Sequence, residues 1–154
     1  YRAMSNLDNV GFEGETDIEA CVASCPDTGT RNGLSVIISD FFTDSDWKKA
    51  VDYLTYKRRQ VMLIQILSPE EIDPSYNGRV HLIDSESESV EDGRNMKIRI
   101  NSSLLRAYQE ALTGMKDELR NYCVKRGADF ISVSTAEPIE RVLFSELFKT
   151  GILS

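Results

Sequence analysis

Histidine is nearly absent from this sequence, so the usual base of nucleophilic catalysis is scarce. The only histidine among the 154 residues is His81. It lies in a stretch that alternates polar and apolar residues, so a surface or packed histidine is the simpler interpretation. Ser–His and Cys–His mechanisms need a histidine base. The sequence also has no Ser nucleophile elbow, no Gly-rich dinucleotide loop and no Walker A lysine motif. Nucleophilic catalysis is therefore disfavoured.

Cysteine is scarce too, which argues against a zinc site and a disulfide framework. The three cysteines are Cys21, Cys25 and Cys123. Cys21 and Cys25 lie on one helix face if their segment is helical, but a zinc site needs further His or Cys ligands, and His81 is far away in another element. The odd count predicts reduced, partly buried thiols in a reducing compartment, where they act as small hydrophobes.

The sequence also lacks a net positive charge and long apolar runs. The formal net charge is -7 and the pI is near 4.8, which disfavours nonspecific binding to nucleic acid and to anionic lipid. No apolar run approaches the roughly 20 residues of a membrane-spanning helix, and no signal peptide is visible. We therefore expect a cytoplasmic segment. Because the chain starts at Tyr1 rather than Met, it is expected to be processed or a piece of a longer protein, whose parent could be membrane-anchored.

What the sequence does contain is an apolar run that stops on a carboxylate, Leu34 to Asp40. Its residues Leu34, Val36, Ile37 and Ile38 predict a strand buried on both faces, as in parallel sheets. Ligands of open α/β sheets bind beyond the carboxyl ends of the strands. Asp40 is therefore a candidate residue of a metal-binding or phosphate-binding site.

Helical and strand patterns alternate along the chain and predict an α/β fold with a parallel sheet and right-handed crossovers. Two alternating runs joined by an acidic turn over residues 85–93 predict a β-hairpin with one wet face. We find no internal repeat and no linker, so residues 1–154 are expected to form one domain. The predicted elements are a short helix capped by Thr16 and Glu19, strand 34–40, helix 47–58, strand 60–67, hairpin strands 78–84 and 96–101, a helix from Ser102 or Ser103 to Arg126, strand 129–135 and a helix from Pro138.

Two loops after predicted strands are rich in acids, which suit a hard cation such as Mg²⁺. One holds Asp40, Asp44 and Asp46, and the other holds Glu70, Glu71 and Asp73. Asp44 and Asp46 are assigned to the start of a helix, where acids favour the helix dipole. Glu70 and Glu71 are interpreted as structural or surface residues. For Asp40, a ligand role and a structural role stay open.

The order of these motifs resembles a von Willebrand factor A-like domain, and more narrowly the domain of unknown function 58 family. The resemblance spans nearly the whole chain and depends on order and spacing. The residues that carry it are Thr16-Asp17, the run Leu34 to Phe42, Ser68-Pro69-Glu70-Glu71, Gly78, Asp84-Ser85-Glu86, Leu104 to Tyr108, Arg126-Gly127-Ala128-Asp129 and Ser134-Thr135 before Pro138. Ser68 stands where the family usually has Asp.

The resemblance implies a three-layer, Rossmann-like fold whose N-terminal strands are missing from this chain. It also implies that Thr16 and Asp40 correspond to two ligands of a Mg²⁺ site. The Asp-x-Ser-x-Ser motif that supplies the other ligands in von Willebrand A domains is not present in the sequence. Weak or no metal binding is therefore expected. The strand that carries Asp40 would lack its usual neighbour, so Val36 to Ser39 would form an open apolar edge prone to self-association.

The function that this resemblance implies is a non-enzymatic protein-interaction module, assisted by a metal ion and working with a MoxR-type AAA ATPase. Two alternatives stay open. One is a Mg²⁺-dependent phosphoryl-transfer or hydrolase domain that uses Asp40 and the acids around Glu70. The other is a purely structural domain.

Overall fold

A three-stranded parallel sheet forms the centre of the molecule, in the order β1-β2-β5. The computed structural model describes residues 16–25, 33–75, 78–82, 96–138 and 140–142. Strand β1 spans Leu34–Ser39, β2 spans Gln60–Leu67 and β5 spans Asp129–Ser134. The register of β1 on β2 runs from Leu34 opposite Gln60 to Ser39 opposite Gln65. The predicted α/β fold with three parallel strands is therefore confirmed.

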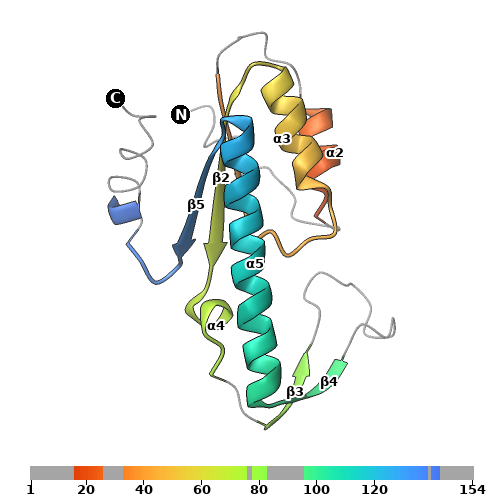
Figure 1. The fold of residues 1–154 in the computed structure, drawn as a ribbon, viewed down its shortest axis with the longest axis vertical. Coiled ribbons are helices and arrows are strands. Elements are labelled where there is room, and N and C mark those ends of the chain that lie inside the picture. The colour runs from red at the N-terminus through yellow and green to blue at the C-terminus, as the bar shows by residue number, and fades with distance from the viewer. Residues whose placement is uncertain (1–15, 26–32, 76–77, 83–95, 139, 143–154) are drawn as a thin grey trace, which may run out of the picture.

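Three helices cover one face of this sheet: α2 (Ile18–Ser24), α3 (Trp47–Tyr56) and α5 (Ser102–Arg126). In Figure 1, α5 runs along the sheet in front of β2, and α2 and α3 lie beside one another. Side chains from all three helices meet the sheet in one core. Fully buried Val51, Leu63 and Leu119 anchor it, and burial of each stabilises the fold by about 1.5–3 kcal/mol relative to an exposed position.

The predicted hairpin is also confirmed, as a separate two-stranded antiparallel sheet. Strand β3 (Gly78–Leu82) pairs with β4 (Met96–Ile100), with Gly78 opposite Ile100. The short helix α4 (Pro69–Ile72) precedes it, and Figure 1 shows the hairpin at the end of α5 remote from α3. The predicted acidic turn over residues 85–93 lies outside the described residues.

Several helix ends differ from the predictions by one or two residues. The N-cap of α2 is Asp17 rather than Thr16, because the Asp17 carboxylate accepts a hydrogen bond from Ala20 N at 2.9 Å. The N-cap of α5 is Asn101, whose side chain accepts from Leu104 N, rather than Ser102 or Ser103. Each stretch holds adjacent residues able to cap a helix, and sequence alone does not choose between them. Helix α5 ends at Arg126 as predicted, and its C-cap Gly127 is left-handed, with φ 66°.

The prediction that β1 is buried on both faces is wrong. Leu34, Val36 and Ile38 are 40%, 42% and 60% exposed, and the residues between them are half-buried. Strand β2 has the same apolar character, but its alternate residues Val61, Leu63, Gln65 and Leu67 are buried against the helices. The exposed residues of β1 lie on the face away from the helices, where Ile66 of β2 is also 37% exposed. On that face Met62, with a strand on each side, is buried, whereas its partner Val36 is 42% exposed because β1 pairs within the described sheet only with β2.

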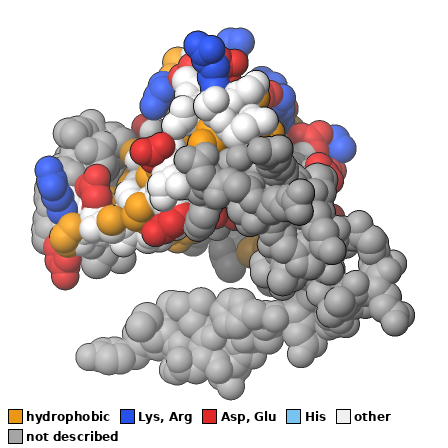
Figure 2. All heavy atoms as spheres, turned by 90° about the horizontal axis from the view of Figure 1, so that it is seen from below, with side chains coloured by type: hydrophobic (Ala, Val, Ile, Leu, Met, Phe, Trp, Pro, Cys, Tyr) orange, Lys and Arg blue, Asp and Glu red, His pale blue; other side chains and the backbone are white. Residues whose placement is uncertain are grey.

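The prediction of a third layer lies largely outside the described residues. Of the helix predicted from Pro138, only Pro138 and residues 140–142 are described. Within the part of the chain that is described, no helix is long and apolar enough to cross a membrane. Figure 2 shows acidic and basic side chains interspersed over the described surface on one side of the molecule.

Candidate functional site at the carboxyl end and open edge of strand β1

Asp40 follows β1 directly, as predicted, and it is exposed. Its carboxylate accepts a hydrogen bond from Phe42 N at 2.9 Å, which makes a local turn of the kind Asp commonly forms. The next residue, Phe41, has a φ of 63° and is buried. Its ring meets the Trp47 ring edge-on at a centroid distance of 6.4 Å. Asp40 therefore has a structural role in the turn that leads from β1 to α3.

Thr16 contacts the same loop through its backbone carbonyl. The Thr16 carbonyl accepts a hydrogen bond from the Thr43 hydroxyl at 3.2 Å, and the Thr43 hydroxyl accepts from Ser45 N at 3.1 Å. The loop that begins at Asp40 is thus tied to the start of α2.

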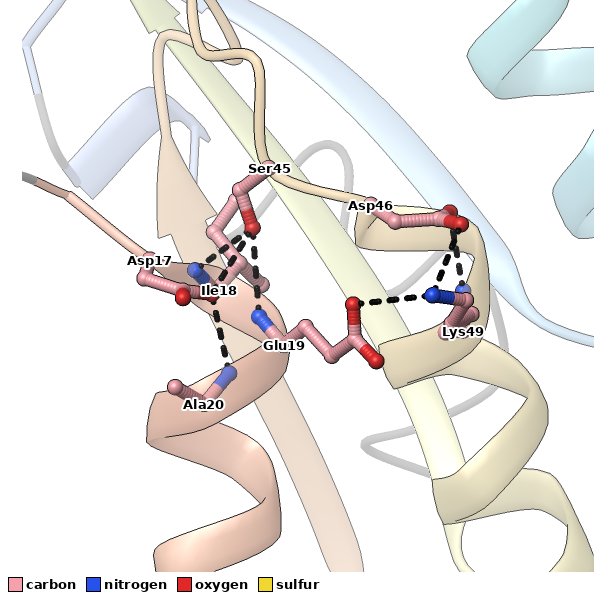
Figure 3. A network of polar contacts seen from close by, with 7 residues as sticks. All are labelled: Asp17, Ile18, Glu19, Ala20, Ser45, Asp46 and Lys49. Atoms are coloured by element: carbon pink, nitrogen blue, oxygen red, sulfur yellow. Dashed lines mark hydrogen bonds and ion pairs between the residues drawn. The ribbon is translucent and has the colours of Figure 1, made fainter.

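Ser45 is the centre of the polar contacts in this region (Figure 3). Its hydroxyl oxygen accepts from Ile18 N at 2.9 Å and Glu19 N at 3.2 Å, and its hydroxyl donates to Asp17 Oδ1 at 3.2 Å. These bonds satisfy amides at the first turn of α2, which have no partner within the helix. Ser45 therefore fixes the start of α2 against the loop before α3.

Lys49 of α3 forms an ion pair with Glu19 of α2. Its ammonium lies 3.3 Å from Glu19 Oε2 and 3.7 Å from Asp46 Oδ2 (Figure 3). The two carboxylates raise the pKa of the Lys49 ammonium, Glu19 more than Asp46. Asp46 also caps α3 by accepting from Lys49 N. Asp46 is therefore the N-cap of α3, as predicted, and the Lys49–Glu19 pair joins α3 to α2.

Below this loop, Gln65 is the one fully buried polar side chain among the described residues. Its amide donates to the Asp40 carbonyl at 3.0 Å and accepts from the Ser132 hydroxyl at 3.0 Å. Gln65 thereby links the carboxyl ends of all three parallel strands. A buried amide without partners would cost about 1–3 kcal/mol, so these two bonds fix the geometry under Asp40.

The described residues do not fit a complete Mg²⁺ site. Mg²⁺ takes about six oxygen ligands in octahedral geometry, usually with several waters and one or two carboxylates. Of the implied ligands, the Asp40 carboxylate already accepts from Phe42 N, and Thr16 brings at most one hydroxyl. Within the described ranges, no group of three or more His, Cys, Asp or Glu side chains is placed to hold a metal ion.

The acids after β2 also serve the fold. Ser68 and Glu71 form a reciprocal capping box at the start of α4, with Glu71 Oε2 accepting from Ser68 N at 2.6 Å. The Glu71 carbonyl accepts from the Tyr108 hydroxyl at 2.6 Å, which ties α4 to α5. Burial, and then the charge of Glu71, raise the pKa of the Tyr108 phenol. The structural interpretation of Glu71 is confirmed.

The other side of β1 is an open edge. In a parallel ladder a residue directs its N–H and C=O to one side, and the next residue directs both to the other side. The Gly33 carbonyl accepts from Gln60 N at 3.1 Å, so Ser35, Ile37 and Ser39 face β2. The backbone groups of Leu34, Val36 and Ile38 therefore face away from β2, where no further strand pairs among those described.

Arg59 marks one end of this edge. Its guanidinium donates to the Leu34 carbonyl at 3.1 Å and to the Ser35 hydroxyl at 3.0 Å. It also fills the space beside Gly33, where an added Cβ would lie 2.7 Å from Arg59 Nη1. The arginine thus crosses β1 from the start of β2 to reach the open edge. A positive charge stands at the amino end of the edge, and the carboxylate of Asp40 follows its carboxyl end.

An open, largely apolar groove of about 600 Å³ follows β1 along its whole length, between the strand and α2. All six residues of β1 line it, together with Cys21 and Val22 of α2 and its C-cap residue Cys25. Cys21 and Cys25 are exposed free thiols, whereas Cys123 is buried in the core. The prediction of partly buried thiols therefore holds only for Cys123. Burial raises the pKa of the Cys123 thiol to about 11.

Comparison with known proteins establishes the family. A family model described as "Protein of unknown function DUF58" matches residues 2–118. The chain belongs to the DUF58 family. No curated protein matches the chain.

Two solved structures resemble this DUF58 chain over nearly its whole length. One is the conserved hypothetical protein BatB from Bacteroides thetaiotaomicron, with 12% identity and a TM-score of 0.46, over 98% of this chain and 69% of that chain. The other is an aerotolerance-related membrane protein from Bacteroides fragilis, with 14% identity and a TM-score of 0.44, over 96% of this chain and 68% of that chain. Similarity this distant carries no conclusion about what the DUF58 chain binds.

Sequence reasoning missed three residues that organise this region of the DUF58 chain: Ser45, Arg59 and Gln65. Gln65 left a visible signal, because it is a polar residue at an inward position of an otherwise apolar strand. Ser45 precedes the predicted helix 47–58 and is a residue type typical of a helix cap, whereas its hydroxyl bonds to amides 26 and 27 residues away. Arg59 gave no signal, because a long side chain at a strand start reads as a solvated charge.

Proposed function

We propose that this DUF58 chain is a non-catalytic protein-interaction module of the von Willebrand A type, and that the open edge of β1 is its contact surface. The observation that carries the proposal is the arrangement at β1. Outward-facing backbone groups, exposed Leu34, Val36 and Ile38, and an apolar groove all lie along one strand. An exposed edge of this kind can pair with a strand of another chain, which is a recurrent mode of protein recognition.

The proposed partner is the one that the family resemblance implies, a MoxR-type AAA ATPase. Backbone hydrogen bonds to the edge would supply affinity, and side chains of the added strand would supply specificity by entering the groove beside α2. The proposal does not depend on a cation, because Thr16 and Asp40 fall short of a Mg²⁺ site.

Binding between the purified chain and a MoxR-type ATPase tests this proposal directly. Ile38→Glu places a charge on the open edge, and we expect it to abolish binding measured by biolayer interferometry. Val124→Glu is the matched control, because Val124 is an aliphatic residue on α5 with 73% exposure. Loss of binding in Ile38→Glu alone supports the proposal. Equal binding by both variants and the parent chain would refute the β1 edge as the contact surface.

Calorimetry with Mg²⁺ and Mn²⁺ tests the metal question separately. We expect no binding tighter than millimolar. The Asp40→Asn variant keeps an oxygen that accepts from Phe42 N but removes the charge, and it should give the same result. Micromolar binding that Asp40→Asn removes would show that Asp40 belongs to a functional metal site.

A further inference from the structure

We infer that the occupant of the β1 edge in the isolated chain is a second copy of β1, paired antiparallel about a two-fold axis that passes beside Val36. The inference rests on the proposed function, because it assigns an occupant to the same contact edge when the ATPase is not bound. The pairing would join two three-stranded sheets into one sheet of six strands. A two-fold contact of this kind is self-complementary, since each copy presents the same surface to the other.

The first argument is the pattern of backbone groups. Leu34, Val36 and Ile38 direct their N–H and C=O groups away from β2, as the Gly33–Gln60 hydrogen bond requires. With Val36 opposite Val36 of the second copy, Leu34 lies opposite Ile38 of that copy, and Ile38 opposite its Leu34. All three positions then form the hydrogen-bonded pairs of an antiparallel ladder. The register therefore uses the outward groups of Val36 and Ile38 and the Leu34 N–H. The Leu34 carbonyl already accepts from Arg59, and its second lone pair is the one that the register would use.

The second argument is charge. Arg59 holds the Leu34 end of the edge through its bond to the Leu34 carbonyl, and exposed Asp40 follows the Ile38 end. Antiparallel pairing brings Arg59 of each copy beside Asp40 of the other. Parallel pairing would instead place like charges side by side, which is unfavourable. The charges at the two ends thus select the antiparallel arrangement.

The third argument is the match of side chains. The exposed aliphatic residues Leu34, Val36 and Ile38 lie on one face of β1, so antiparallel pairing would set them directly against the same residues of the second copy. Aliphatic cross-strand pairs of this kind stabilise sheets. On the other face, the groove between β1 and α2 is open along all six residues of the strand. The side chains of the added strand that point to this face, with Ile37 as the apolar one, would enter the groove.

Sedimentation velocity over a range of concentrations tests the inference on the 154-residue chain. We expect a reversible dimer. Val36→Pro removes an N–H that faces away from β2, so it leaves the ladder to β2 intact and is tolerated at an edge. It should weaken association about tenfold or more. Ile38→Lys, a charge of the kind that blocks edges, gives a second reading if Val36→Pro impairs folding, which circular dichroism would reveal.

The charge argument has its own pair of variants. Asp40→Asn should weaken the dimer about two- to tenfold, and added salt should weaken the parent dimer but have less effect on Asp40→Asn. Asp44→Asn removes an exposed acid that lies four residues further along the same loop, and it should leave association unchanged.

A chain that stays monomeric at all concentrations, or a dimer that survives both Val36→Pro and Ile38→Lys, would overturn the inference. Binding to the ATPase separates this outcome from failure of the proposed function. A monomer whose ATPase binding is lost in Val36→Pro contradicts the second copy but supports the edge as a contact surface. A monomer whose ATPase binding survives Val36→Pro contradicts both.

Discussion

Strands β1 and β2 are neighbours of similar apolar content, yet only β2 is enclosed. On the face away from the helices, Met62 of β2 is 1% exposed, whereas its register partner Val36 of β1 is 42% exposed. The two strands differ in position rather than in composition, because β2 lies between two strands and β1 lies at the edge of the described sheet. An apolar run therefore predicts a strand well, but it does not predict what covers the strand.

The same truncation on the two strands should give the largest contrast. Leu63→Ala removes a fully buried side chain from the core, and we expect a loss of about 2–5 kcal/mol in the free energy of unfolding. Leu34→Ala makes the same chemical change at the edge, where we expect a loss of about 1 kcal/mol or less. Urea denaturation of both variants measures the difference. Equal losses would show that β1 is as enclosed as β2.

Substitution of the two glutamines of β2 compares a buried with an exposed position of one strand. Gln65→Leu leaves the Asp40 carbonyl and the Ser132 hydroxyl without the partner they have now, at an expected cost of about 1–3 kcal/mol. Gln60→Leu is the control, because Gln60 is an exposed glutamine at the start of the same strand. Its expected effect is within about 0.5 kcal/mol. A neutral Gln65→Leu would remove the evidence that this side chain fixes the ends of the three strands.

Thiol reactivity compares the open groove with the enclosed core without any substitution in the chain. Cys21 and Cys25 border the groove at β1 and should react rapidly with a thiol reagent at neutral pH. Cys123 should react only on unfolding, because it is buried and its pKa is raised from 9.0 to about 11.

The raised pKa of Cys123 also predicts a pH dependence of stability. Between about pH 9 and 11 the unfolded chain loses the thiol proton while the folded chain keeps it, so the contribution of Cys123 to stability should fall as the pH rises through this range. Cys123→Ser should show a weaker fall over the same range. Rapid labelling of Cys123 in the native protein would contradict its burial.

Much of the fold follows from local pattern, because local pattern depends on neighbours in sequence. The bounds of β2 agree with the prediction, and α5 runs to Arg126 before the left-handed Gly127 as predicted. Helix α3 was predicted to reach Arg58 but ends at Tyr56, since Arg58 has a φ of 57°. Such ends depend on a few competing local bonds.

The candidate site was less predictable, because its contacts join residues far apart in the chain. Asp40 was identified from its position after a strand, but its bond to Phe42 N is a matter of turn geometry. The reach of Arg59 across β1 to the Leu34 carbonyl depends on the path of one flexible side chain. Neither has a periodic signature. The open edge itself was predicted only through the family resemblance.

Hydrogen exchange at Val36 and Ile37 tests the central claim most directly. The two amides are adjacent, but Ile37 N–H faces β2 and Val36 N–H faces the open edge. With residue-resolved exchange at several protein concentrations, we expect Ile37 to be protected throughout. Val36 should be unprotected in dilute solution and gain protection as concentration rises and the second copy binds. Protection of Val36 equal to that of Ile37 at every concentration would contradict the account, because the edge would then be covered within the chain.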